Sequence, residues 1–576
     1  MSTSPGHAEL MARLRSLGPR ELAALRQRSG TPAATGAAWV AEALLRAGIR
    51  EVLTIPGVPI DPVLAECITR GIRVLGFRHQ QAAVLAAAAA NYTAGTLRSA
   101  VVVSSGPAVA NTLTGIQVAC ANGWPVLVLG GRRAISDDGL GAFQSLDALP
   151  ILGPFTVHAA CLRQRARVME EILEAAAATV AGRPGPAYVD LPEDVLSASV
   201  SCTECVPSAP RPREEPDPGL IAEVAERIRT ARRPLLILGD GLRWSLATEV
   251  LRSLVDVYGI PFISTSVARG YLPDDHPRCA GEVRQWVQGE ADLVLAAGAR
   301  LDWRFRFGAG LKPDAFVVHA EEGADAFVGA RRADRTNSGD PNQFLRALVA
   351  ALDASPAAPA MGAREPWNAR IADAREEQRR VREGWALKSG HPMSPQQFCG
   401  ALQDSLPSDA FLVMEGNVVL STAHRILSLR QPVSWLDPGA NGIIGAALPF
   451  ALGVRIADSR RPIVAVCSDT GFGISGLELE TAVRNRFPLV VIVVNNGGNT
   501  GDLRERAMFP GDHPDPVALI HSAVRYDHLA ESLGAEADRV SEAVQLGPAL
   551  QRALGSGRTV CIEVRVDPSQ PHPGSW

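Results

Sequence analysis

Two apolar runs that each end in small polar residues constrain this chain more than any other feature. The first run ends in Ser-Asp-Thr-Gly at 468–471, the second ends in Asn-Asn-Gly-Gly at 495–498, and a helical pattern separates them. In a parallel strand–helix–strand unit both carboxyl ends open on one edge of the sheet, so Asp469 and Asn496 are expected to meet there. Carboxylate, amide and backbone carbonyl oxygens suit Mg²⁺ that carries a phosphate ester. The glycines let the backbone approach a diphosphate.

Composition excludes several classes of partner. The net charge of −4 gives no electrostatic reason to expect a nucleic-acid or anionic-membrane partner. No apolar run reaches the ~18 residues of a membrane span, and the N-terminus lacks a signal-peptide pattern. Nine dispersed cysteines fit reduced thiols, so a cytoplasmic location is expected.

Three α/β regions are expected along the 576 residues. A polar helical arm at 1–33 precedes regions at 34–200, 219–353 and 367–576, and Pro-rich segments separate the regions. Alternating apolar helices and β-rich runs predict a doubly wound parallel sheet in each region. The predicted strand segments begin at Glu51, Ser99, Pro125, Ala187, Pro234, Pro261, Ala291, Ala315, Phe411, Ile463, Leu489 and Val560.

The 468–498 pattern resembles the thiamine-diphosphate signature, which is Gly-Asp-Gly followed by Asn-Asn. The three regions resemble the pyrimidine-binding, central and diphosphate-binding domains of the thiamine-diphosphate-dependent decarboxylases and carboligases, over roughly residues 36–570. The resemblance implies that Asp469, Asn496 and the carbonyl of Gly498 hold Mg²⁺ and the diphosphate. Ser468 and Thr470 replace the two glycines of the signature, and small hydroxyl residues can form the same turn before Gly471.

Two further segments of the third region resemble cofactor-binding segments of the family. Glu415 and Asn417 belong to one, and Gly442 and Ile444 belong to the other. By the resemblance, Ile444 is the bulky apolar residue that props the cofactor in its V shape. That shape brings the cofactor's amino nitrogen close to its reactive carbon, which is catalysis by proximity.

Gln80 is the largest departure from the family. The segment 77–83 reads Phe-Arg-His-Gln-Gln-Ala-Ala, where the family usually has Arg-His-Glu or Arg-Asn-Glu. The resemblance implies that this Glu hydrogen-bonds N1′ of the aminopyrimidine and promotes loss of the C2 proton. An amide can hydrogen-bond N1′ but cannot transfer a proton at ordinary pH, and loss of an acid/base group typically costs ~10²–10⁴ in rate. Three alternatives stay open: a slow but active enzyme, compensation by a neighbour such as His79, or an inactive site.

Two other segments of the first region resemble loops that face cofactor and substrate. Asn111 closes the Ser-Gly-Pro segment at 104–111, where a polar site residue and a helix-capping residue are equally good interpretations. Gln144 ends a Gly-Ala-Phe-Gln segment whose glutamine reaches the active site in the family.

Finer resemblance favours the branch of the oxalyl-CoA decarboxylases and 2-hydroxyacyl-CoA lyases. It implies a lyase or carboligase that acts on a 2-oxo acid or acyl-thioester donor, with small-molecule donor and acceptor. A nucleotide or CoA moiety near Arg300 of the central domain is part of this expectation. Two arginines, Arg132 and Arg133, depart from the branch and are either surface residues or partners of a carboxylate or phosphate.

Two alternatives remain: an acetolactate-synthase-like enzyme, and a non-catalytic partner protein with this fold. The resemblance also implies a homodimer or homotetramer in which Gln80 of one subunit lies opposite the Asp469 site of its neighbour.

Overall fold

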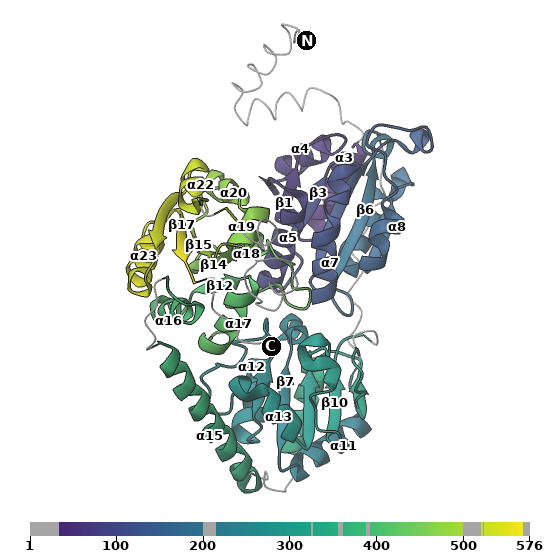
Figure 1. The fold of residues 1–576 in the computed structure, drawn as a ribbon. Coiled ribbons are helices and arrows are strands. Elements are labelled where there is room, and N and C mark those ends of the chain that lie inside the picture. The colour runs from purple at the N-terminus through teal and green to yellow at the C-terminus, as the bar shows by residue number, and fades with distance from the viewer. Residues whose placement is uncertain are drawn as a thin grey trace, which may run out of the picture.

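Three α/β units, each built on a parallel sheet, make up the described part of the chain (Figure 1). Figure 1 shows the first unit, in purple to blue, beside the third, in green to yellow, with the teal central unit below them. The expected arm at 1–33 and the linker residues 207–214 lie outside the described residues. The computed structural model describes residues 34–199, 215–323, 327–354, 361–386, 392–498, 520–521 and 523–567.

The first unit has a six-stranded sheet. Its inner strands are apolar and buried on both faces, as expected for a parallel sheet covered by helices. In sheet order the strands are β2 (Arg73–Gly76), β1 (Glu51–Ile55), β3 (Ser99–Val103), β4 (Val126–Arg132), β6 (Pro186–Pro192) and β5 (His158–Cys161). The helices are α3 (Gly36–Arg46), α4 (Asp61–Thr69), α5 (Gln80–Ala94), α6 (Pro107–Ala110), α7 (Leu113–Asn122), α8 (Leu149–Leu152), α9 (Val168–Ala178) and α10 (Glu193–Leu196).

The central unit has a five-stranded sheet. In sheet order its strands are β11 (Arg335–Asn337), β10 (Phe316–Ala320), β9 (Leu293–Ala297), β7 (Pro234–Leu238) and β8 (Phe262–Ser264). Its helices are α11 (Pro218–Thr230), α12 (Thr248–Arg252), α13 (Arg284–Glu290) and α14 (Pro341–Asp353). The N-termini of two of these helices are well stabilised, because Asp217 caps α11, Asp340 caps α14, and a proline occupies the first turn of each helix.

The third unit carries the strands predicted to bear the site. In sheet order they are β13 (Trp435–Leu436), β12 (Phe411–Met414), β14 (Ile463–Ser468), β15 (Leu489–Asn495), β17 (Thr559–Arg565) and β16 (Glu536–Val540). The helices are α16 (Pro395–Ser405), α17 (Asn417–Ile426), α18 (Ala447–Ala457), α19 (Asp469–Ser475), α20 (Glu478–Arg484), α22 (Tyr526–Ser532) and α23 (Ala543–Gly555). Strands β14 and β15 are parallel neighbours, so their carboxyl ends lie on one edge.

Helix α15 (Met361–Ala386) runs from the central unit toward α16 (Figure 1). Its Trp367 and Ile371 belong to the core of the central unit, and the Trp367 indole donates a hydrogen bond to the carbonyl of Pro234 at 3.2 Å. The domain start expected at residue 367 therefore falls within a helix whose first half packs on the central unit.

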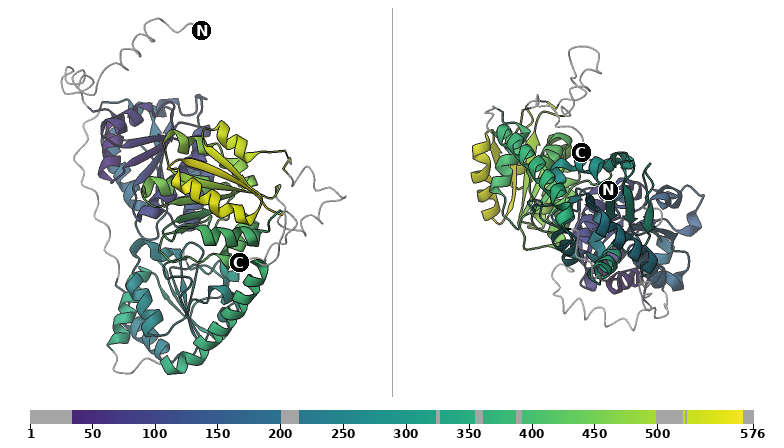
Figure 2. Two further views of the ribbon diagram at one scale, coloured as in Figure 1. Left: turned by 90° about the vertical axis from the view of Figure 1, so that its left-hand side faces the viewer. Right: turned by 90° about the horizontal axis from the view of Figure 1, so that it is seen from below.

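The first and third units share one hydrophobic core. Helix α5 crosses α18, and the views in Figures 1 and 2 show the two units packed against each other. A Cβ at Gly453 of α18 would lie only 2.1 Å from the carbonyl oxygen of Ala86. The alanine-rich sequence of α5 thus serves close helix packing, which fixes the polar start of α5 relative to the third unit.

Candidate active site

Asp469 joins the carboxyl ends of β14 and β15. It is the first residue of α19 and is 0% exposed. Its Oδ2 accepts hydrogen bonds from the backbone N–H groups of Gly497 and Gly498, both at 2.8 Å. Asn496 lies directly before these glycines and is half-buried. The two strand ends therefore meet as the sequence pattern predicts.

The hydroxyl residues beside Asp469 form the expected turn. Ser468 caps α19, and its hydroxyl accepts a hydrogen bond from the N–H of Gly471 at 3.0 Å. The backbone of Ser468 is extended, with φ −69°, so no glycine is required at this position. Thr470 donates to Asp469 Oδ1 through its backbone N–H at 2.6 Å and its hydroxyl at 3.3 Å.

Burial raises the pKa of Asp469, and the N–H groups of Gly498, Thr470 and Gly497 act in the opposite direction. A divalent cation beside the carboxylate would lower this pKa further. Among the described residues no group of three His, Cys, Asp or Glu side chains could hold a metal ion. An ion at Asp469 would therefore need amide, carbonyl or ligand oxygens as well, which agrees with the type of donors that the strand ends offer.

Open space surrounds the backbone beside this carboxylate. Gly442 and Gly497 have φ angles of +70° and +84°, and within the described part of the chain no heavy atom lies within 4 Å of a Cβ built at either residue. Ile444 follows Gly442 and is 39% exposed, which is unusual for a large apolar side chain. Its neighbour Gly445 is packed, because a Cβ there would lie 2.7 Å from Ile474. Exposed backbone and an exposed apolar side chain thus leave room for a ligand next to this part of the third unit.

Glu415 lies beneath the open loop. It is 1% exposed, and its Oε2 accepts hydrogen bonds from the N–H groups of Ala446, at 2.5 Å, and Ala447, at 3.0 Å. Oε1 is buried without a hydrogen-bond partner among the described residues, and a Cβ at Gly471 would overlap it. Burial raises the pKa of Glu415 to about 7, against the effect of these N–H groups. The carboxylate thus ties the start of α18 to the end of β12, and the exposed Asn417 begins α17.

In the first unit, the loop at 105–111 contacts both predicted glutamines. The side-chain amide of Asn111 donates to Gln80 Oε1 at 3.1 Å, and the Ser105 hydroxyl donates to Gln144 Oε1 at 3.3 Å. Gln80 begins α5 and is 9% exposed. Gln144 has a φ of +56°.

His79 is exposed, and its Nδ1 accepts a hydrogen bond from the N–H of Gln81, so the ring caps α5.

Arg132 and Arg133 have carboxylate partners within the first unit. Arg132 pairs with Asp138 at 2.8 Å and with Asp190 at 3.2 Å, and Arg133 pairs with Glu193 at 3.1 Å. These internal partners account for both arginines without a bound anion.

Arg300 lines a cavity of about 20 Å³ together with Arg183, Asp240 and Glu321. Glu321 is buried, and that burial raises its pKa to about 7. The cavity has room for about one water molecule as its side chains stand. The expected nucleotide position is therefore closed.

A much larger cavity of about 870 Å³ lies between the central unit and α15, α16 and α17. Its lining arginines are Arg269, Arg284, Arg375, Arg379, Arg382, Arg425 and Arg430, and its lining carboxylates are Asp274, Asp275, Glu282 and Asp404. Arg284 and Arg425 form no ion pair with a carboxylate among the described residues. Burial lowers the pKa of both, to about 10 for Arg284, where the charge of Arg304 adds to the effect.

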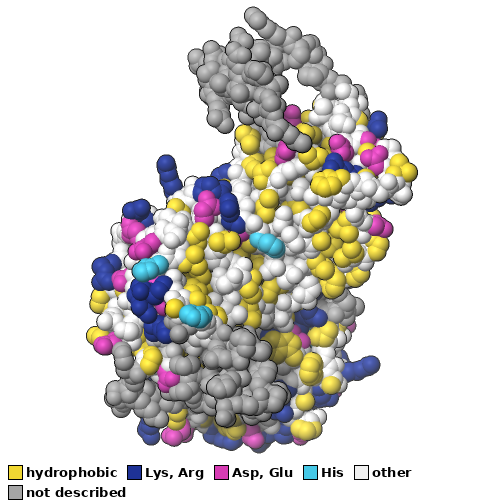
Figure 3. Space-filling view, turned by 45° about the horizontal axis from the view of Figure 1, so that its top comes forward, with side chains coloured by type: hydrophobic (Ala, Val, Ile, Leu, Met, Phe, Trp, Pro, Cys, Tyr) yellow, Lys and Arg dark blue, Asp and Glu magenta, His cyan; other side chains and the backbone are white. Residues whose placement is uncertain are grey.

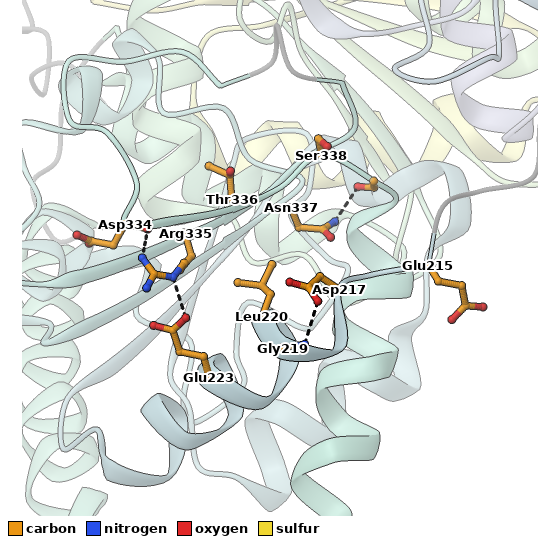
Figure 4. A pocket seen from close by; sticks show the side chains of 11 residues that line it. Glu215, Asp217, Gly219, Leu220, Glu223, Asp334, Arg335, Thr336, Asn337 and Ser338 are labelled. Carbon is orange, nitrogen blue, oxygen red and sulfur yellow. Dashed lines mark hydrogen bonds and ion pairs between the residues drawn. The ribbon is translucent and has the colours of Figure 1, made fainter.

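Figure 4 shows a separate open pocket of about 580 Å³ between the start of α11 and the edge strand β11. Several of its charged groups have partners within the protein: Asp217 caps α11, and Glu223 pairs with Arg335 at 2.7 Å. Nothing in this pocket connects it to the residues described above.

Three parallel α/β units, with a carboxylate–glycine turn at the strand ends of the third unit, define a cofactor-dependent enzyme class that binds diphosphates. Family models of the thiamine pyrophosphate enzymes match each unit in turn. They match the N-terminal TPP binding domain at 34–151, the central domain at 221–348 and the C-terminal TPP binding domain at 416–564. The chain belongs to the thiamine pyrophosphate enzyme family.

Its relatives carry out more than one reaction. The chain is 30% identical to a 2-hydroxyacyl-CoA lyase of Oryza sativa subsp. japonica, over 92% of this chain and 95% of that protein. It is 30% identical to the oxalyl-CoA decarboxylase of Escherichia coli K12, over 92% and 94%. An acetolactate synthase large subunit of Mycobacterium tuberculosis is 29% identical, over 93% and 96%. Such similar identities do not select one substrate.

No helix in the described ranges combines the length and apolarity that a bilayer span requires.

Proposed function

We propose that this protein is a Mg²⁺- and thiamine-diphosphate-dependent lyase or carboligase that cleaves or forms a C–C bond next to the carbonyl of a 2-oxo acid or acyl thioester. The carrying observation is the Asp469 turn, which keeps a buried carboxylate on the Gly497 and Gly498 amides beside open glycine backbone. Bound thiamine diphosphate would supply a nucleophilic carbon and an electron sink. Asp469, Asn496 and the Gly498 carbonyl would hold Mg²⁺, and Ile444 would support the cofactor's rings.

Gln80 would serve as a hydrogen-bond donor rather than as an acid. Its Oε1 already accepts from Asn111, which leaves the Nε2 hydrogens to donate. N1′ of an aminopyrimidine is an acceptor, so this orientation matches it without proton transfer. The expected consequence is a slow but active enzyme. The non-catalytic alternative is disfavoured, because a chain without catalysis has no need to keep a buried carboxylate at this turn.

An anionic, extended donor is favoured by the arginine-lined cavity. Helix α17 begins at Asn417 beside the site and ends near Arg425 in the cavity. Ten residues of helix span ~15 Å, so a donor that reaches both the site and the cavity would have to be extended. Partly desolvated arginines that form no ion pair with a described carboxylate, such as Arg284 and Arg425, suit phosphate groups. This favours an acyl-CoA donor over an acetolactate-synthase-like reaction with small 2-oxo acids.

A cofactor-binding experiment tests the core of the proposal. Asp469→Ala removes the anionic ligand, so calorimetry with thiamine diphosphate and Mg²⁺ should detect loss of binding, whereas Asp138→Ala on the surface of the first unit should bind normally. Unchanged binding by Asp469→Ala would refute the assignment.

A substrate screen tests the donor. Purified protein with thiamine diphosphate and Mg²⁺ is offered 2-oxo acids and acyl-CoAs. Arg284→Ala and Arg425→Ala should raise KM for acyl-CoAs by about tenfold or more. Arg346→Ala, which removes an exposed pair with Glu249, should leave KM unchanged. Turnover of 2-oxo acids alone, unaffected by the first two variants, would favour the acetolactate-synthase-like alternative.

We also propose a homodimer or homotetramer in the cytoplasm. The cysteines within the described ranges are free thiols, which supports a reducing compartment. Ile474 in α19, the helix that begins at Asp469, is 56% exposed, and Leu477 just after this helix is 61% exposed. Figure 3 shows hydrophobic side chains spread over the face turned to the viewer. Exposed apolar side chains at a site are typical of an interface with another subunit.

A further inference from the structure

A buried carboxylate outside the predicted site joins the first and third units. Glu478 is the first residue of α20 and is buried. Its Oε1 accepts hydrogen bonds from the backbone N–H groups of Arg78 at 3.0 Å and His79 at 2.9 Å. Its Oε2 accepts from the Thr481 hydroxyl at 2.7 Å. One side chain of the third unit thus holds the two residues that directly precede Gln80.

The same helix makes two more contacts with this segment. The guanidinium of Arg484 donates to the carbonyl of Gly76 at 2.8 Å, and Glu480 fixes Arg484 at 2.9 Å. Glu480 also lies 3.8 Å from the guanidinium of Arg78. Residues 76–79 therefore lie against α20, and α5 begins directly after them.

Retaining a carboxylate here has a free-energy cost. Burial raises the pKa of Glu478, and the hydrogen bonds from Thr481, Arg78 and His79 together with the charge of Arg78 counteract that effect. A buried carboxylate is tolerated only where directed donors surround it. Those donors therefore fix the position of the chain that supplies them, more sharply than apolar packing would.

Residues 76–79 lie between two parts of the candidate site, α20 on one side and the start of α5 on the other. Helix α20 follows α19, which begins at Asp469, and α18 contacts both helices. On the other side, α5 begins with the Gln80 amide. We propose that Glu478 is a positioning residue that holds the Arg78–Gln80 segment, and with it the Gln80 amide, in place against α20 of the third unit. This inference rests on the proposed role of Gln80.

The first test needs no cofactor. Hydrogen exchange followed by mass spectrometry reports the protection of the Arg78 and His79 amides in the full chain. Glu478→Ala should reduce that protection by at least about tenfold, because both N–H groups lose their acceptor. Glu478→Gln should restore most of it, since the amide oxygen can still accept both bonds. Glu536→Ala, which removes an exposed ion pair with Arg558 on an edge strand, should change protection little.

The second test concerns the loaded protein. Exchange of the C2 hydrogen of bound thiamine diphosphate should slow by at least about tenfold in Glu478→Ala. The affinity for thiamine diphosphate, measured by calorimetry, should change by less than about threefold, because Asp469 is untouched. A merely structural role would lower thermal stability but leave the C2 exchange of the bound fraction intact. Glu478→Gln should recover the exchange rate.

Three results would overturn the inference: wild-type amide protection in Glu478→Ala, wild-type C2 exchange in Glu478→Ala, or slowed C2 exchange that Glu478→Gln fails to rescue. Gln80→Ala separates this inference from the proposed function. If Gln80→Ala leaves C2 exchange unchanged, the role of Gln80 fails, while the amide protection still reports whether Glu478 holds the segment.

Discussion

At the scale of single residues, hydrogen bonds between segments far apart in the chain hold the charged groups of the candidate site. Asp469 and the glycines after Asn496 meet because strand order and strand ends follow from the apolar pattern. The sequence does not predict that Glu478 contacts Arg78 or that Arg132 contacts Asp190, because the residues of each pair lie far apart in the chain. Sequence spacing carries no signal for such long-range pairs without a known motif.

Gln80→Glu tests the most unusual residue of the site. If only N1′ activation is weakened in the wild type, restoring a carboxylate should speed C2 exchange of bound thiamine diphosphate by at least about tenfold, or about 1.4 kcal/mol in barrier. Turnover need not follow, because a carboxylate can also return a proton and favour simple decarboxylation over ligation. Exchange rate and product ratio are measured together, with Gln81→Glu as control. No change in either quantity would mean that Gln80 does not face N1′.

Glu415 predicts a pH dependence of stability. Its pKa of about 7 in the folded protein lies above the ordinary value of 4.5, because burial favours the protonated form. The favourable contribution of protonated Glu415 to the free energy of unfolding is fully present below pH 4.5 and is lost as the pH rises through 7. The wild type should therefore lose up to about 3 kcal/mol relative to Glu415→Gln over this range. Thermal unfolding of both proteins without cofactor measures the difference in stability between them at each pH. If that difference is constant from pH 5 to 8, the prediction is wrong.

At the scale of elements, the inner strands were predictable and most edge strands were not. All twelve strand segments predicted from apolar runs are strands in the structure. The strands without such a run, β2, β5, β11, β13 and β16, all lie at sheet edges. Edge strands bury less surface, so they tolerate polar sequences such as Arg-Thr-Asn in β11. The hydrophobic pattern of the sequence therefore identifies the central strands of each sheet, whereas most edge strands are recognised only from the strand pairing in the structure.

Because α5 and α18 cross closely, we expect glycine-to-alanine substitutions at two helical positions to have opposite effects on stability. At Gly453 an added methyl group meets the backbone of Ala86, so Gly453→Ala should destabilise the protein by about 1–3 kcal/mol. At Gly400 in α16 an added methyl group meets nothing within 4 Å. There the same substitution should stabilise by up to about 1 kcal/mol. Thermal midpoints compare the two; equal shifts would mean that α5 and α18 do not approach this closely.

At the scale of the whole molecule, the three units differ in how they are joined. The first and third units share a core. Helix α15 packs in the core of the central unit and leads to the third unit, and ion pairs such as Arg382 with Glu282 fix α15 to the central unit. Residues that the cofactor would need thus lie on the two units with the tightest contact. The closed cavity at Arg300 and the open arginine-lined cavity both lie along borders of the central unit. Its expected contribution is therefore to substrate binding rather than to the reacting atoms.

The last prediction concerns sites shared between subunits. If Gln80 of one subunit serves the Asp469 site of its neighbour, two defective variants can complement each other. A mixed dimer of Gln80→Leu and Asp469→Ala contains one site with both residues intact and one with neither. Random pairing makes half of the dimers mixed, so co-expression should restore about a quarter of wild-type activity.

Each variant expressed alone is the control, and light scattering should find dimers or tetramers throughout. Complementation also requires that Gln80→Leu alone falls well below a quarter of wild-type turnover. If the mixed protein is no more active than the better single variant, each site is built within one chain. In that case the exposed apolar side chains at Ile474 and Leu477 serve contacts that do not complete the site.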